Sequence, residues 1–153
     1  IGTHFVVDKD GTTYQCASLL KKTAHVGPIR SRCHADGTCS AEELASFKQW
    51  SSRMPCYNHE KKKWYPARYP MNEDSVGIET VAMYHERTRT WDAPTPAQKS
   101  AIRNLVVILK EEYGLDDADI YEHDKIAWKT EGEGAGLYHV LDVPRVQSGL
   151  PDG

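Results

Sequence analysis

The segment Val76-Gly-Ile-Glu-Thr-Val-Ala-Met-Tyr84 gives the clearest indication of how this chain folds. Its residues are mostly apolar on both alternating faces, which is typical of a strand in the middle of a sheet. Glu79 is the exception. Burying an unpaired carboxylate in such a strand is costly, so Glu79 is expected to meet a partner, a metal-bound water or a cleft, unless it lies at an edge open to solvent.

Elements on both sides of this segment complete a sheet domain. Residues 4–7 and 12–16 are β-type runs joined by a glycine-containing turn, a pattern that predicts a hairpin. Downstream, Thr95-Pro-Ala-Gln98 has the residue types of a helix start, and apolar residues recur at helical spacing until Gly114, which predicts the stop. Residues 119–123 are expected to form another short strand. The expected fold class is α/β or α+β, a central mixed β-sheet flanked by helices.

Composition limits the class of protein. The 153 residues are the size of one domain, so residues 1–153 are expected to form a single unit. The formal net charge of -3 argues against a nucleic-acid-binding protein, which normally has a basic surface. No apolar run approaches the length of a transmembrane segment. The sequence starts at Ile1 inside a strand pattern, without an initiator Met or a signal peptide, so we expect a piece of a longer protein.

Residues 28–70 are expected to be a long, mostly irregular insertion, rich in Ser, Pro, Lys and Cys. Within it, Ser40-Ala-Glu-Glu43 is a capping box, with Ser at the N-cap and Glu three residues later. It predicts a helix that ends near Ser51.

Four cysteines predict two disulfides. Cys33 and Cys39 flank a short polar turn and are expected to pair, which leaves Cys16 with Cys56, one of three possible connectivities. Disulfides indicate an oxidising compartment such as the periplasm or the exterior. Two alternatives stay open. One is free thiols, and the other is a zinc site formed by the last three cysteines and His59, whose spacing fits no common zinc module.

The densest group of chemically active side chains lies in Tyr121-Glu-His-Asp-Lys-Ile-Ala-Trp-Lys-Thr-Glu-Gly-Glu-Gly134. This run holds His123, Lys129 and two carboxylates, Glu131 and Glu133. Catalytic zinc is usually held by three protein ligands of the His, Cys, Asp or Glu type. A His and a carboxylate from this loop are candidate ligands, and Lys129 is a candidate for stabilising an oxyanion beside the metal. The alternative is a solvated, glycine-rich turn.

Together, several pieces of the chain resemble the zinc-dependent N-acetylmuramoyl-L-alanine amidases of the type 2 class, which are related to peptidoglycan recognition proteins. The pieces occur in family order and cover most of the chain apart from the insertion. They are Gly2-Thr-His-Phe-Val-Val-Asp-Lys-Asp-Gly-Thr12, Ala24-His-Val-Gly27, Asn72-Glu-Asp-Ser-Val-Gly-Ile-Glu79, and the run from His123 through Lys129 to the glutamate-rich loop.

The resemblance implies a role for each matching residue. His123 matches the second zinc ligand, and the third is expected from the loop after Lys129. Glu133 is slightly preferred over Glu131, because flanking glycines let the backbone bend that carboxylate toward the metal. Lys129 matches the residue that stabilises the developing oxyanion. Glu79 matches the carboxylate that acts as general base on the attacking water.

The resemblance also places His25 and Asn72 in the substrate groove. The family's first zinc ligand is a His on a strand upstream of the motif that contains His4, so this chain starts too late to contain it. We expect that strand to be supplied by a longer chain or to be absent, unless His4 or His25 takes its place. His4 itself is expected to be a structural or groove residue.

The expected function is Zn²⁺-dependent hydrolysis of the amide between N-acetylmuramic acid and L-alanine in peptidoglycan, by a periplasmic or secreted protein. The alternative is a non-catalytic peptidoglycan-binding module, as in family members that lack a zinc ligand. A third hypothesis is an antibacterial effector whose cysteine-bearing insertion contacts an immunity or carrier protein. No nucleic-acid partner and no transmembrane segment are expected.

Overall fold

The structure is a computed structural model that describes residues 2–138. Its strands are β1 (Phe5–Val7), β2 (Thr13–Gln15), β3 (Ile78–Thr80), β4 (Tyr84–His85) and β5 (Thr90–Trp91). Its helices are α1 (Arg32–Asp36), α2 (Ala41–Trp50), α3 (Arg53–Glu60), α4 (Pro96–Tyr113), the 3₁₀-helix η1 (Asp117–Asp119) and α5 (His123–Ile126). Within this part of the chain, no helix has the length and apolar character needed to cross a membrane.

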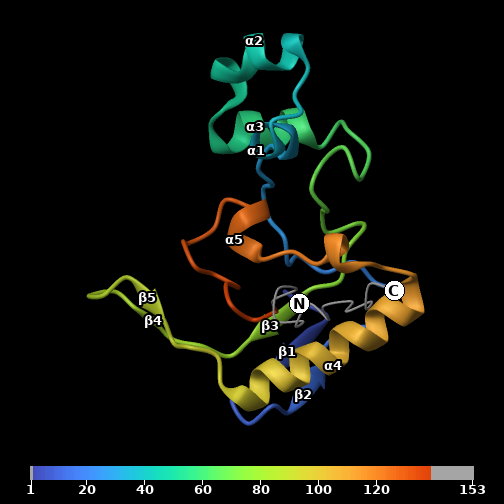
Figure 1. Ribbon diagram of the computed structural model, residues 1–153, viewed down its shortest axis with the longest axis vertical. Coiled ribbons are helices and arrows are strands. Elements are labelled where there is room, and N and C mark those ends of the chain that lie inside the picture. The colour runs from blue at the N-terminus through green and yellow to red at the C-terminus, as the bar shows by residue number, and fades with distance from the viewer. Residues whose placement is uncertain (1, 139–153) are drawn as a thin grey trace, which may run out of the picture.

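The sheet is mixed, as expected. β1 pairs with β2 antiparallel and with β3 parallel, in the order β2-β1-β3. The expectation that residues 76–84 form its central strand is wrong for the described residues: β1 is central and β3 lies at the edge. The chain leaves the sheet after Val81, whose N–H donates to the carbonyl of Val7. It then forms the β4–β5 hairpin, which projects away from the sheet (Figure 1).

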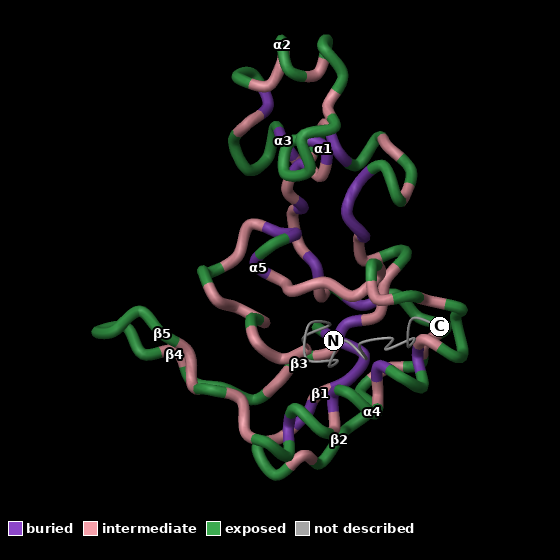
Figure 2. The backbone as a smooth tube through the Cα atoms, in the orientation of Figure 1, coloured by how far each residue is buried: buried purple, intermediate pink, exposed green. Residues whose placement is uncertain are grey.

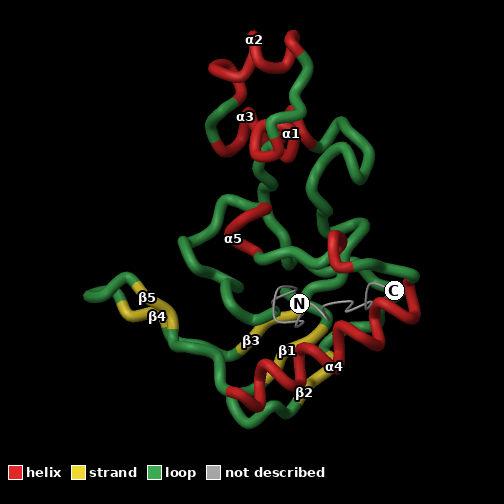
Figure 3. The backbone as a smooth tube through the Cα atoms, in the orientation of Figure 1, coloured by secondary structure: helices red, strands yellow, loops and turns green. Residues whose placement is uncertain are grey.

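Helix α4 lies along the three-stranded sheet, as Figure 3 shows. Its capping box and left-handed Gly114 stop confirm the predicted start and end. The helix buries Ile102 and Val106 against Val7, with Ile78 packed at the side of this cluster. Gln98 is almost fully buried, and its Nε2 donates to the carbonyl of Val81 at 2.9 Å, which ties the first turn of the helix to the end of β3.

The strand expected over residues 119–123 is wrong. Asp116 caps η1 with reciprocal hydrogen bonds to Asp119, so this part of the chain forms a 3₁₀-helix and not the start of a strand. Ile120 is extended but pairs with no strand among the described residues, and the chain then turns into α5 at His123. The residue of greatest chemical interest therefore starts a short helix.

The insertion is helical, which corrects the expectation of a mostly irregular region. Helix α2 confirms the predicted capping box at Ser40, whereas α1 and α3 were not predicted. Figure 1 shows the three helices gathered at one end of the long axis, apart from the sheet. Figure 2 shows that much of the surface of α2 is exposed and that buried residues lie where the helices meet.

The predicted Cys33–Cys39 disulfide is present and joins the start of α1 to the residue before Ser40. The predicted Cys16–Cys56 pair is wrong. Cys16 is exposed just after β2, whereas Cys56 is buried within α3, so the two thiols are held by different parts of the fold. Burial raises the pKa of the Cys56 thiol, and the nearby carboxylate of Glu60 raises it further.

Candidate active site

One cavity of about 340 Å³ brings together five of the residues selected from the sequence. The described residues that line it include His25, Glu79, His123, Lys129 and Glu133. They come from three distant stretches: the loop after the β1–β2 hairpin, the edge strand β3, and the segment around α5. Figure 1 shows the segment that follows α5 running back toward β3. An adjacent hollow of about 670 Å³ shares His25, Glu79 and His123 with this cavity.

His123 is oriented by the backbone. Its Nε2 lies 2.9 Å from the carbonyl oxygen of Val26, which only accepts, so Nε2 carries the proton and donates. The other nitrogen, Nδ1, lies 3.2 Å from Oε1 of Glu133. A neutral imidazole with its proton on Nε2 would present a lone pair to this carboxylate, and the two atoms would repel. A close contact between them is favourable only with a second proton on His123 or with a cation that both atoms bind.

The separation of these two atoms fits a shared zinc ion. Two ligands on a tetrahedral zinc with bonds of about 2.0–2.1 Å lie about 3.3 Å apart. The observed 3.2 Å between Nδ1 of His123 and Oε1 of Glu133 matches that spacing. The second nitrogen of His123 is held by a backbone carbonyl, the usual outer partner of a histidine that ligates a metal.

The glycine that follows Glu133 allows the backbone to place this side chain beside His123. Gly134 has a φ of 84°, and a Cβ added there would lie 3.0 Å from the backbone nitrogen of His123. The backbone carbonyl of Glu133 accepts from the N–H of Asp124, so the loop folds back onto the start of α5. The positive φ of Gly134 allows the loop to fold back in this way. Glu131, by comparison, is exposed and does not line the cavity.

Lys129 and Glu79 add a cation and a second carboxylate. The ammonium of Lys129 lies 3.7 Å from Oε1 of Glu133, so it lies beside the His123–Glu133 pair. Glu79 pairs in register with Val6, between Ile78 and Thr80. Because side chains alternate along a strand, Glu79 points away from the face that Ile78 packs against α4. Its carboxylate is exposed at the cavity, which resolves how a charged residue fits into this strand.

His25 is a neutral member of the cavity wall. The Ser75 hydroxyl donates to the carbonyl of Met71 and so accepts from Nε2 of His25 at 2.9 Å. The Thr23 hydroxyl lies 2.8 Å from Nδ1. Burial lowers the pKa of His25, and the nearby imidazoles of His4 and His123 lower it further. A Cβ at Gly77 would lie 2.5 Å from the His25 ring, so this glycine makes room for it.

His4 and Asn72 have bonding partners in the fold. Nε2 of His4 donates to the carbonyl of Lys21, and its Nδ1 accepts from the N–H of Gly77. With 2% of its surface exposed, His4 links the hairpin to β3 and offers no free nitrogen to a metal. Oδ1 of Asn72 accepts from the N–H of Val26, and Asn72 does not line the cavity. It holds the loop whose carbonyl orients His123.

Two residues that shape the site were not predicted from the sequence. Asp124 is buried, and its Oδ2 accepts from the N–H of Gly132 at 2.8 Å, which anchors the loop that carries Glu133. Trp91 lines the cavity from the end of β5 and lies close to Gly132. Asp124 had a weak signal in the sequence, namely its position directly after His123. Trp91 had none, because its place depends on the course of the β4–β5 hairpin.

Comparison with known families identifies the chain. The sequence profile described as N-acetylmuramoyl-L-alanine amidase matches residues 1–135, well over half of the chain. No curated protein and no solved structure was found that matches it. The family match agrees with the mixed α+β fold and confirms the resemblance drawn from the sequence motifs. The chain belongs to the type 2 family of N-acetylmuramoyl-L-alanine amidases, hydrolases whose substrate is peptidoglycan.

Proposed function

We propose that this protein hydrolyses, with zinc, the amide that joins the lactyl group of N-acetylmuramic acid to L-alanine of the peptidoglycan stem peptide. The observation that carries the proposal is the pair formed by Nδ1 of His123 and Oε1 of Glu133, 3.2 Å apart. Beside this pair, the cavity supplies an ammonium and a separate carboxylate. Metal-assisted amide hydrolysis needs these groups: ligands, an oxyanion stabiliser and a base.

His123 and Glu133 would hold the zinc. When bound, zinc supplies Lewis acidity that polarises the amide carbonyl and makes water a stronger acid. A catalytic zinc site normally has three protein ligands. Among the described residues, His4 is fully engaged with the backbone, and His25 would have to leave Ser75 or Thr23 to serve as the third. We therefore assign two ligands, with Glu133 in place of Glu131.

The remaining groups handle protons and charge. Glu79, exposed at the cavity, takes a proton from the attacking water, whose oxygen adds to the amide carbon. The ammonium of Lys129 faces the negative charge that develops on the carbonyl oxygen. Glu79 then returns the proton to the departing nitrogen of L-alanine. His25 lines the wall in its neutral form, and the adjacent hollow gives space for the sugar and the peptide on either side of the bond.

Mass spectrometry of the products from purified peptidoglycan tests this proposal. Zinc-supplemented protein is expected to release stem peptides that begin at L-alanine, and a chelator is expected to stop the release. Glu79→Gln should abolish turnover while bound zinc stays unchanged, whereas the matched change Glu111→Gln on the exposed face of α4 should have no effect. Full turnover by the Glu79 variant would exclude it as the base.

A non-catalytic recognition module is the second candidate. It is favoured by the two rather than three assigned ligands among residues 2–138. A recognition module would sediment with intact peptidoglycan and release no peptide even with excess zinc, and Lys129→Ala would then weaken binding. In an amidase, the same change is expected to lower turnover more than binding.

We further propose a periplasmic or secreted protein, for which the Cys33–Cys39 disulfide is the supporting observation. An antibacterial role, with an immunity or carrier protein bound to the helical insertion, is compatible with this chemistry. Capture from the producing cell's lysate by the whole chain, but not by a variant with altered exposed residues Leu44 and Met54 of the insertion, would support such a partner.

A further inference from the structure

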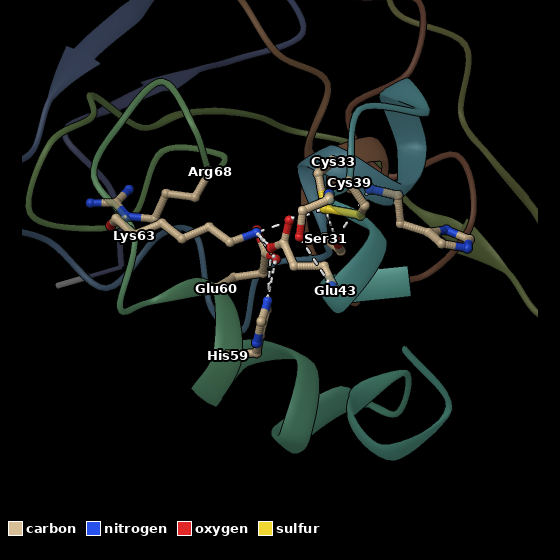
Figure 4. Close-up of polar contacts among 10 residues, drawn as sticks. Ser31, Cys33, Cys39, Glu43, His59, Glu60, Lys63 and Arg68 are labelled. Atoms are coloured by element: carbon tan, nitrogen blue, oxygen red, sulfur yellow. Dashed lines mark hydrogen bonds and ion pairs between the residues drawn. A yellow bond between two sulfur atoms is a disulfide. The ribbon is translucent and has the colours of Figure 1, made fainter. Parts of the chain in front are cut away.

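The helical insertion holds a second group of ligating side chains, separate from the amidase cavity. Ligand atoms of Cys33, Cys39 and Glu43 lie within 4.8 Å of one another, and so do those of Glu43, His59 and Glu60. Glu43 belongs to both sets, so the two sets form one continuous cluster. Figure 4 shows these side chains converging from α1, from the turn between α1 and α2, and from α2 and α3.

Local structure fixes each of these side chains. Oε2 of Glu43 accepts from the N–H of Ser40 in the capping box of α2, which turns Oε1 into the cluster. His59 and Glu60 are the last two residues of α3. The ring of Trp50 stacks on His59 at 4.2 Å, and Nε2 of His59 lies 3.1 Å from Oε1 of Glu43. The carboxylate of Glu43 and the ring of His59 are therefore held in place before any ion binds, and the two sulfurs become available when the disulfide is reduced.

The cluster contains more negative charge than its one lysine compensates. The ammonium of Lys63 lies 2.6 Å from Oε1 of Glu43, 2.8 Å from Oε1 of Glu60 and 3.7 Å from Sγ of Cys33. Glu60 has none of its side chain exposed, and its Oε2 is buried without a hydrogen-bond partner in the part of the chain that is described. A buried carboxylate oxygen in this state is an unsatisfied acceptor, and it adds to the negative potential that favours a cation in this cluster.

We propose that the reduced insertion binds one divalent ion of the zinc class through Cys33, Cys39, Glu43 and His59. The ion takes the position beside Glu43 and Cys33 that the ammonium of Lys63 now occupies. Lys63 keeps its ion pair with Glu60, three residues earlier on the chain. Two thiolates, an imidazole and a carboxylate form a donor set that suits zinc rather than calcium or magnesium.

The redox step requires a dithiol reductant. The dithiol gives two electrons and two protons to the Cys33–Cys39 bond, which breaks, and the reductant itself becomes a disulfide. Each new thiol loses its proton when it ligates the ion, so one zinc ion releases two protons. The oxidised protein holds the disulfide and the lysine, and the reduced protein holds the metal. This site does not depend on the amidase proposal.

Cobalt(II) titration of the phosphine-reduced chain tests the site. The titration is made in a His123→Ala background, so that the amidase cavity does not compete for the ion. One equivalent is expected to bind with a thiolate-to-cobalt charge-transfer band in the near ultraviolet, which zinc then abolishes. The oxidised protein is expected to lack this band. Absence of the band in the reduced protein would overturn the proposal.

Variants assign the ligands. Cys33→Ser and His59→Ala are each expected to weaken cobalt binding about tenfold or more, and Cys16→Ser, at an exposed cysteine outside the insertion, should leave it unchanged. Lys63→Met removes the competing ammonium and should tighten binding about tenfold, a gain that misfolding does not produce. Equal affinity in the Cys33 and Cys16 variants, or no gain in the Lys63 variant, would contradict the proposed site.

Discussion

At the scale of single residues, the structure separates two glutamates that look alike in the sequence. Glu133 faces His123 across 3.2 Å, whereas Glu131 is exposed outside the cavity. Glu133→Gln is expected to lower zinc affinity by about tenfold or more, because it removes a charged ligand. Glu131→Gln should change it little. Competition with a chromophoric chelator measures both, and the reverse order would assign the ligand to Glu131.

Gly134 permits the contact that places Glu133. An alanine there meets the backbone nitrogen of His123 at 3.0 Å in addition to the cost of a positive φ. Gly37 also has a positive φ, but a Cβ there meets nothing within 4 Å. Both Gly→Ala changes are expected to lower the free energy of unfolding by about 1–2 kcal/mol. Only the change at Gly134 should also reduce zinc binding and amidase turnover. Equal turnover in the two variants would show that the loop tolerates a displacement.

At the scale of elements, capping decides which helices start where. Oγ1 of Thr95 accepts from the N–H of Gln98 and donates to the carbonyl of Lys9 at 2.6 Å, so it joins α4 to the turn between β1 and β2. Thr95→Ala is expected to lower the free energy of unfolding of the whole domain by about 1 kcal/mol. Chemical denaturation measures this. Thr88→Ala, in the exposed turn between β4 and β5, is the matched control and should not measurably change the free energy of unfolding.

Elements with local signals were predictable, and those that depend on distant partners were not. The capping boxes at Ser40 and Thr95 are written in adjacent residues, and both helices start where predicted. The apolar run at 76–84 resembled a central strand, but β3 pairs with β1 alone among the described strands and so lies at the edge of the sheet. Cys56 was paired by elimination, and its burial in α3 keeps it from Cys16.

The candidate site shows the same difference between features that local sequence predicts and features that depend on distant contacts. The family motifs selected five of the residues that line the cavity, because their chemistry can be recognised without knowing the fold, and they also selected Asn72, which does not line it. The sequence could not show which nitrogen of His123 faces Glu133, since that depends on a carbonyl 97 residues away. Asp124 and Trp91 were missed for the same reason. Their roles come from contacts across the fold.

At the scale of the whole molecule, paired carboxylates determine how the protein responds to acid. The contact with Lys63, followed by that with His59, lowers the pKa of Glu43 from 4.5 to about 2. A carboxyl group whose pKa is lower in the folded state stabilises the fold in full above its unfolded pKa, and this contribution is lost as the pH falls toward the folded value. Glu43 therefore stabilises the insertion above about pH 4.5 and stops doing so near pH 2.

Glu43→Gln is accordingly expected to weaken the fold at pH 7 and to make stability less dependent on pH between 4.5 and 2. Hydrogen bonds from Lys9, and then from His85, also lower the pKa of Asp92, so some acid sensitivity should remain in the variant. Urea unfolding followed by circular dichroism across this range measures the slope, with the exposed change Glu111→Gln as control. Identical slopes for the wild type and the Glu43 variant would mean that the Glu43–Lys63 pair gives no net stability, because the cost of partly burying its charges cancels their attraction.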